Sequence, residues 1–123
     1  MRAVRHALLA GDDTSEFDFV SLRPFDDATL LLETRVAIAR FFDVPTTRIN
    51  RDVQLVDDLR VDKLEPFFQF SVVKSVIASQ RIEPEPFGFS MAGIETIDDL
   101  TAAIRHVING FDRNIKDQGK PES

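Results

Sequence analysis

The side chains best suited to chemistry are concentrated between Asp57 and Leu64, where the chain reads DDLRVDKL. Carboxylates surround the amine of Lys63, and they favour its protonated form, which is not nucleophilic. Lys63 is therefore predicted to be a solvated surface side chain, with an intermolecular salt bridge as the alternative. The segment is expected to make contacts with other proteins and not to catalyse a reaction.

The remaining reactive residues do not combine into a catalytic or metal site. Ser90 lies in the sequence Gly88-Phe89-Ser90-Met91, but Ala92 stands where a hydrolase elbow needs its second glycine. His6 and His106 are isolated, and Asp12-Asp13 lacks the spacing of a calcium loop. The sequence predicts no enzyme activity, no metal and no cofactor.

Composition narrows the class of protein further. The chain has 123 residues, no cysteine and a net charge of -6, which fits one domain in the cytoplasm. Its acidity argues against binding to nucleic acid or to an anionic membrane. No apolar run is long enough to span a bilayer. Eleven Phe without Trp or Tyr indicate packing rather than ligand recognition.

The segment that contains Lys63 resembles the fingerprint of the acyl carrier protein family, Asp-Leu-Gly-x-Asp-Ser-Leu. The matching residues are Asp58, Leu59, Asp62 and Leu64. Arg60 stands at the Gly position, and Lys63 stands at the Ser whose hydroxyl carries the phosphopantetheine arm in that family. An ammonium cannot form that phosphate ester. The resemblance therefore implies a carrier frame without its attachment atom.

The resemblance covers about residues 26–111 and implies an all-α, acyl-carrier-protein-like four-helix bundle with a long first loop. The first helix is expected to begin near Asp26 or Asp27 and to end at Asp43-Val44-Pro45. In the loop from Thr46 to Leu59, aliphatic side chains are expected to reach the core, namely Ile49, Val53, Leu55, Val56 and Leu59.

The second helix is expected from Asp62 to Ser79, with Asp62 as N-cap and Glu65 completing a capping box. A short third helix is expected in the connector between Arg81 and Thr96, anchored by two phenylalanines, Phe87 and Phe89. Thr96 and Asp99 predict the start of the last helix, and Asn109-Gly110 predict its end. Its apolar stripe comprises Ile97, Leu100, Ile104, Val107, Ile108 and Phe111.

Segments outside this domain complete the expectation. Residues 1–25 are predicted to be an extension that packs on the bundle, with a helix over Arg2 to Ala10 and an extended segment over Glu16 to Leu22. The residues expected to bury apolar area there are Phe17, Phe19, Val20, Leu22 and Phe25. Residues 112–123 are polar and are predicted to be a disordered tail.

The second helix is apolar nearly all the way round, which predicts burial on more than one side. The family pattern places Phe70, Val73 and Ile77 in the core. The other set, Phe68, Val72 and Val76, then faces outward or lies under the N-terminal extension. An outward patch predicts contact with a second copy or another protein. The predicted interaction residues are Asp58, Arg60, Asp62, Lys63, Leu64, Glu65, Phe68, Val72 and Val76.

Together these patterns predict a non-catalytic, carrier-like protein that acts as an interaction partner, regulator or structural subunit. Enzymes that synthesise acyl chains, lipids or polyketides are the candidate partners. The alternative is a genuine carrier that holds an acyl group through another residue or through modified Lys63. An enzyme is the third and least favoured class.

Overall fold

In the computed structural model, residues 2–22, 27–80 and 93–119 are described, and these are mostly helical, with no β-strand among them. The main helices, in chain order, are α1 (Arg2–Ala10), α2 (Glu16–Ser21), α3 (Ala28–Phe42), α4 (Glu65–Phe68), α5 (Lys74–Ser79) and α6 (Ile97–Gly119). Two 3₁₀ turns, Thr46–Arg48 and Val61–Lys63, interrupt the long loop after α3, and a π-helical segment, Gln69–Val73, joins α4 to α5. The described part of the chain is therefore all-α, as the sequence predicts.

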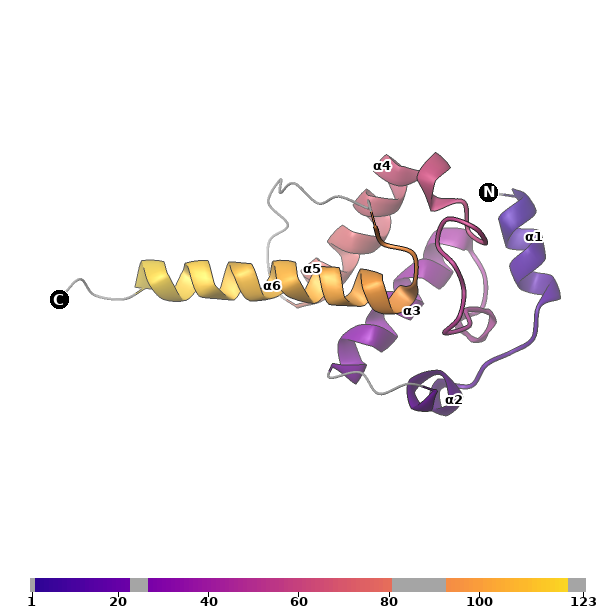
Figure 1. Ribbon diagram of the computed structural model, residues 1–123, viewed down its shortest axis with the longest axis horizontal. Coiled ribbons are helices and arrows are strands. Elements are labelled where there is room, and N and C mark those ends of the chain that lie inside the picture. Colours follow the sequence, from indigo (N-terminus) through magenta and orange to yellow (C-terminus); the bar gives the residue numbers. More distant parts are fainter. Residues whose placement is uncertain (1, 23–26, 81–92, 120–123) are drawn as a thin grey trace.

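Helix α3 lies at the centre of the body, and α6 crosses it (Figure 1). The C-terminal half of α6 extends beyond the body, while α1 lies at the opposite end of the molecule. Over the described ranges, no helix combines the length and the apolar character that a membrane crossing needs. The third helix expected near Phe87 and Phe89 lies outside the described residues.

The boundaries of α3 confirm the prediction from local sequence. The carboxylate of Asp27 caps the helix by accepting a hydrogen bond from the backbone N–H of Leu30 at 3.0 Å. At the other end, Asp43 adopts a left-handed conformation with φ 55°, and its N–H donates to the carbonyls of Ala39 and Arg40. The chain then leaves the helix before Pro45, as expected.

The start of α6 also agrees with the prediction, whereas its end does not. The N–H of Asp99 donates to Thr96 Oγ1 at 3.0 Å, and Asp99 Oδ2 accepts the N–H of Thr96 at 3.2 Å, which is a capping box. The predicted stop at Asn109-Gly110 is wrong, because the helix continues to Gly119. A glycine ends a helix when it turns left-handed, and Gly110 does not. Residues 112–119, predicted to be disordered, are helical.

The N-terminal segment contains two helices. The helix predicted over Arg2 to Ala10 is present as α1, but the predicted extended segment is the helix α2. Ser15 caps α2 by accepting the N–H of Asp18 at 3.1 Å. Helical geometry directs Phe19 inward and Phe17 outward, so Phe19 is fully buried while Phe17 is 78% exposed.

Other residues of the extension also depart from the expectation. Val20 is half-buried, as predicted, but Leu22 is exposed. Phe25 lies outside the described residues. Among the described residues of the extension, Phe19 is the buried aromatic side chain, and Val4 and Val20 pack on the same core.

The loop between α3 and α4 is held against the core by four of the five predicted aliphatics, Ile49, Val53, Leu55 and Leu59. Val56 is exposed, because the turns around it place its side chain on the solvent side. The N–H of Leu55 donates to the carbonyl of Glu95 at 2.8 Å, and Gln54 forms an isolated antiparallel bridge with Thr96. The loop is thus tied to the start of α6.

The second helix begins later than predicted. Asp62 lies in the 3₁₀ turn Val61–Lys63 and makes no capping bond to the helix, which starts at Glu65. The turn closes through two backbone bonds, from the N–H of Lys63 to the carbonyl of Arg60 at 3.0 Å and from the N–H of Leu64 to that of Val61 at 2.9 Å. These bonds replace the predicted capping box.

The π-helical segment decides which side of this helix is buried. The buried residues are Phe68, Val72, Val73, Val76 and Ile77. Their spacing is i, i+4, i+5, i+8 and i+9, which has one residue more than the i, i+3, i+4, i+7, i+8 stripe of an α-helix. A π turn accommodates the extra residue, so all five side chains face the core. Phe70, predicted in the core, is exposed.

Candidate functional site

Residues 57–64 form a compact turn that leads into α4. Leu59 is fully buried and anchors the turn. The carboxylate of Asp58 accepts the backbone N–H of Gln54 at 2.8 Å, and the N–H of Val61 donates to the carbonyl of Leu55 at 3.0 Å. Asp58 therefore shapes the loop, in addition to being exposed on its surface.

Arg60 has a left-handed backbone, with φ 56° and ψ 38°. This conformation disfavours residues that carry a Cβ and favours glycine. Arg60 occupies the position at which the carrier fingerprint has Gly. The backbone at position 60 thus has a conformation that glycine adopts readily, although the residue at this position is arginine.

Lys63 is exposed at the end of the turn, directly before α4. Among the residues that the structure describes, none pairs with its ammonium. Asp62 and Arg60 are likewise exposed, while Leu64 is half-buried. The turn therefore exposes the charged side chains of Arg60, Asp62 and Lys63 to solvent, next to the half-buried Leu64. The side chain of Glu65 lies outside the described ones.

The predicted outward patch on the second helix is wrong. Phe68, Val72 and Val76 are buried within the chain. The ring of Phe68 packs edge-on against that of Phe41 of α3, with centroids 5.4 Å apart, so it is covered by its own domain and not by a partner or by the N-terminal extension. Phe68 and Val72 are fully enclosed and cannot form an interface in the folded chain.

The exposed apolar side chains of this helix are instead Phe67 and Phe70, at 71% and 66% exposure. The ammonium of Lys74 lies 4.6 Å from the ring centroid of Phe70, within the range of a cation–π interaction. Phe70 was predicted in the core with Val73 and Ile77, and the π segment that begins at Gln69 places it on the solvent side instead.

A groove runs along the seam between α3 and the α4–α5 helix. One part has a volume of about 510 Å³ and is lined by Ala37, Arg40, Phe41, Leu64, Phe67, Ser71 and Ser75. A second part of about 380 Å³ continues toward Glu16 and Glu33, and it shares Ala37, Arg40 and Ser75 with the first. Both parts are open to solvent. We call them together the α3–α5 groove.

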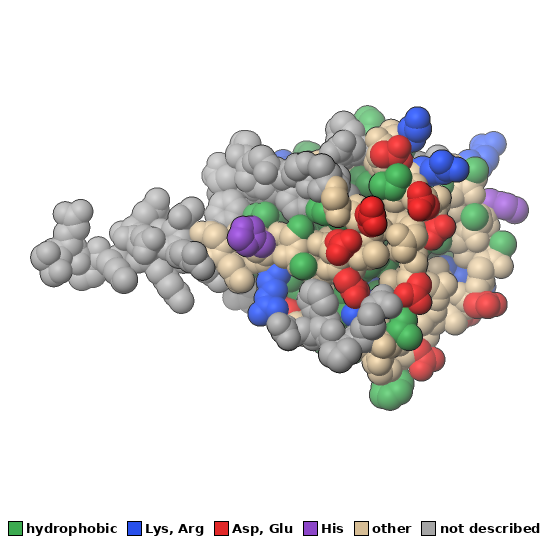
Figure 2. Space-filling view, in the orientation of Figure 1, with side chains coloured by type: hydrophobic (Ala, Val, Ile, Leu, Met, Phe, Trp, Pro, Cys, Tyr) green, Lys and Arg blue, Asp and Glu red, His purple; other side chains and the backbone are tan. Residues whose placement is uncertain are grey.

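A different face of the molecule is acidic. Figure 2 shows carboxylates gathered over the loop and the start of α6. A hollow of about 450 Å³ on this side is lined in part by Asp18, Asp52 and Asp58. Among the described residues, no group of three His, Cys, Asp or Glu side chains is placed to hold a metal ion. The acidic hollow thus provides charge but no recognisable metal site.

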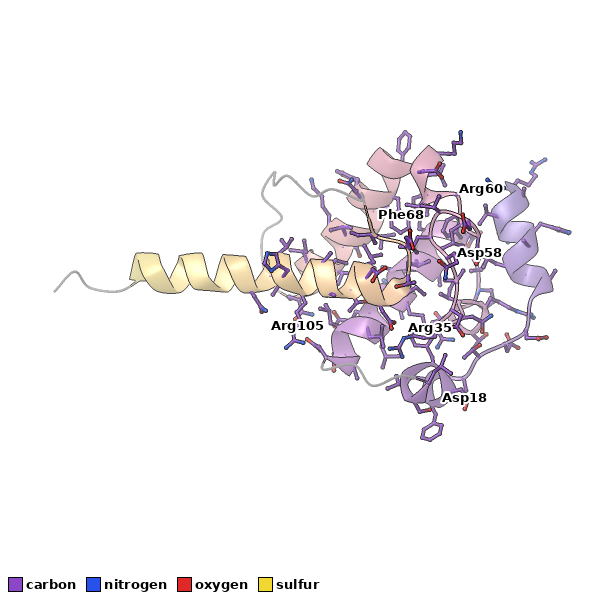
Figure 3. All side chains as sticks on the ribbon, viewed as in Figure 1. Asp18, Arg35, Asp58, Arg60, Phe68 and Arg105 are labelled. Carbon is purple, nitrogen blue, oxygen red and sulfur yellow. The ribbon has the colours of Figure 1, made fainter. Side chains whose placement is uncertain are left out.

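Two buried arginines that the sequence analysis missed hold the extension in place. Arg51 donates to the carbonyl of Phe19 at 2.8 Å, and its Nε lies 2.5 Å from Asp98 Oδ1 of α6. The guanidinium of Arg35 lies over the ring of Phe19, 4.3 Å from its centroid, and donates to the carbonyl of Ile49 at 3.0 Å. Figure 3 shows Arg35 between α3 and α2.

Burial lowers the pKa of Arg35 from its ordinary value, and the nearby carboxylate of Glu16 opposes that effect. Arginine titrates so high that the side chain stays charged at neutral pH. One signal for Arg35 was present in the sequence, because it lies on the inner side of α3 beside Leu31 and Ile38. Arg51 lies in an irregular loop and had no such signal. We call Phe19, Arg35, Arg51 and Asp98 the arginine latch.

Comparison of the chain with protein-family models, curated proteins and solved structures finds no match. Its function is therefore argued from the residues and the geometry above.

Proposed function

We propose that this chain is an acyl-carrier-like protein that lacks the phosphopantetheine attachment group and acts through protein contacts. The observation that carries the proposal is the turn before α4. Arg60 has the left-handed backbone that suits the Gly of the carrier fingerprint, and position 63 is exposed directly before the helix. Lys63 supplies an ammonium there, so the ester to the arm cannot form.

Two further features favour an interaction role. Phe67 and Phe70 are large apolar side chains exposed on the helix that follows the turn. Aromatic side chains often carry much of the binding energy when an interface covers them. An exposed pair beside the α3–α5 groove is therefore a reasonable anchor for a partner protein.

The loss of the arm is tested by intact mass after co-expression with a phosphopantetheinyl transferase. We expect the mass of the wild-type chain to be unchanged. Lys63→Ser restores the hydroxyl, but we expect poor modification because Arg60 remains at the glycine position. A gain of the arm's mass by the wild type would overturn the proposal and favour a carrier that uses another residue.

The interaction role is tested by photo-cross-linking in the source cells. A photoreactive amino acid replaces Phe67 or Phe70, and Phe17, equally exposed but on α2, is the matched control. We expect discrete cross-linked products from positions 67 and 70 and none from 17. Absence of products from both helix positions would remove the interaction role.

A further inference from the structure

The α3–α5 groove has the dimensions of a helix-binding site. On α3 its lining extends from Thr29 to Phe41, which corresponds to about 18 Å at 1.5 Å per residue. That length equals about three turns of a docked helix. The opposite wall contains Ser71 and Ser75, whose short side chains allow another helix to approach closely.

The groove is too open for a small ligand. Small-molecule sites bury most of the ligand surface, whereas both parts of this groove face solvent along their length. An amphipathic helix needs to bury only one face and uses grooves of this shape. The apolar residues that line the groove are Leu32, Val36, Ala37, Phe41, Leu64, Phe67 and Val76.

Charge indicates what kind of helix fits. Arg40 lines both parts of the groove, is exposed and has no partner among the described residues. The described lining of the part beside Phe67 contains no carboxylate. The second part also contains two carboxylates, those of Glu16 and Glu33, and the carboxylate of Glu33 accepts hydrogen bonds from Ser79 and Gln80, each at 2.7 Å. A carboxylate is therefore the complementary group beside Arg40 and Phe67, whereas Glu16 and Glu33 disfavour one at the far end of the second part.

We propose that the α3–α5 groove binds an amphipathic helix of a partner protein, with a carboxylate beside its apolar stripe that meets Arg40. This inference rests on the proposed interaction role and adds the class of partner. A second copy of this chain fits less well. Its α1 is amphipathic, with Val4 as its buried residue, but it carries no carboxylate that could meet Arg40.

The test is a selection from helices displayed on a folded bundle, so that the ordering cost of a free peptide is avoided. Library members share one leucine stripe and carry Glu, Lys or Gln at a position beside it. The wild-type chain should enrich the helices with Glu at that position. Arg40→Glu should reverse the preference toward Lys. The matched control Arg2→Glu, which changes an exposed cation on α1, should leave the selection unchanged.

Ser75→Trp fills the region common to both parts of the groove and should weaken binding of the selected helix at least about tenfold, or about 1.4 kcal/mol. Circular dichroism and thermal unfolding establish that each variant is folded. If Ser75→Trp does not fold, the selection with Arg40→Glu still tests whether the groove binds the helix. Equal binding to wild type and Ser75→Trp, or a charge preference that Arg40→Glu does not change, would overturn the inference.

Two other outcomes separate this inference from the proposed function. Cross-links from position 67 without groove-dependent helix binding would keep the interaction role and remove the groove as its site. A wild-type dimer in sedimentation that Ser75→Trp dissociates would identify a second copy as the occupant, contrary to the inference.

Discussion

At the scale of single residues, two cations in this protein occupy positions that normally disfavour them. Arg60 is held in a left-handed backbone conformation, and Arg51 is almost fully buried. Each is accommodated by its surroundings. Backbone bonds fix the turn around Arg60, while a carboxylate and backbone carbonyls surround the guanidinium of Arg51.

We expect Arg60→Gly to stabilise the fold by about 0.5–1 kcal/mol, because glycine removes the left-handed penalty but loses more backbone entropy on folding. The measurement is the free energy of unfolding from urea titration. Arg60→Ala is the control, since it removes the same long side chain and keeps the Cβ. An equal gain from both variants would mean that the side chain, and not the backbone, is the cause.

We expect Arg51→Met to destabilise the protein by about 3 kcal/mol, because it removes the buried guanidinium that donates to Asp98 and to the carbonyl of Phe19. Arg48→Met is the matched control. Arg48 pairs with Asp13 through more exposed side chains, so its loss should cost less than about 1 kcal/mol. Similar losses in the two variants would contradict a special role for Arg51.

At the scale of elements, the second helix is defined by one additional residue. Its core residues follow the ordinary α-helical stripe except for an insertion between Phe68 and Val72, and the π segment absorbs it. The insertion brings Val72 and Val76, which were predicted to face outward, into the same core as Val73 and Ile77. It also leaves Phe67 and Phe70 exposed beside the α3–α5 groove.

Deletion of Ser71, an exposed residue of the π segment, should therefore be tolerated. It would restore the i, i+3, i+4, i+7, i+8 spacing of the buried residues, and we expect a cost of about 1 kcal/mol. Deletion of Val36 in α3 is the control, since it rotates the following core residues by about 100° and should cost more than about 4 kcal/mol. Urea unfolding measures both. Equal loss in the two deletions would contradict the insertion account.

At the scale of the whole molecule, segments distant in the sequence are joined by the arginine latch. Arg51 bonds α2 to the loop and to α6, and Arg35 of α3 packs on Phe19 and donates to the backbone of Thr14. The N-terminal segment is thereby an integral part of the body. α1 contributes less, because Val4 is its buried residue.

Removal of residues 1–22 should therefore lower the free energy of unfolding by at least about 3 kcal/mol, because it deletes the buried ring of Phe19. Removal of residues 1–10 should have a smaller effect, since α2 and the latch remain. Urea unfolding of the full chain and both truncations measures the difference. If the chain without residues 1–22 unfolds at the same urea concentration as the full one, the latch is not a stabilising element.

The sequence by itself determined the features that arise from bonds between near neighbours. Asp27, the Thr96–Asp99 box and the stop before Pro45 all involve contacts within a few residues, so their patterns predicted the ends of α3 and the start of α6. The exposure of Lys63 was also predicted. The 3₁₀ turn in which Lys63 lies was not, since a helix was expected to begin at Asp62.

Tertiary structure alone decided which side chains meet. Whether Phe17 or Phe19 is buried depends on arginines from α3 and the loop, and the sequence pattern of the extension does not contain that information. The π turn is likewise selected because it brings Phe68 and Val73 onto the same core. Such choices depend on packing partners far along the chain, which is why the predicted outward patch was wrong and the α3–α5 groove was not predicted.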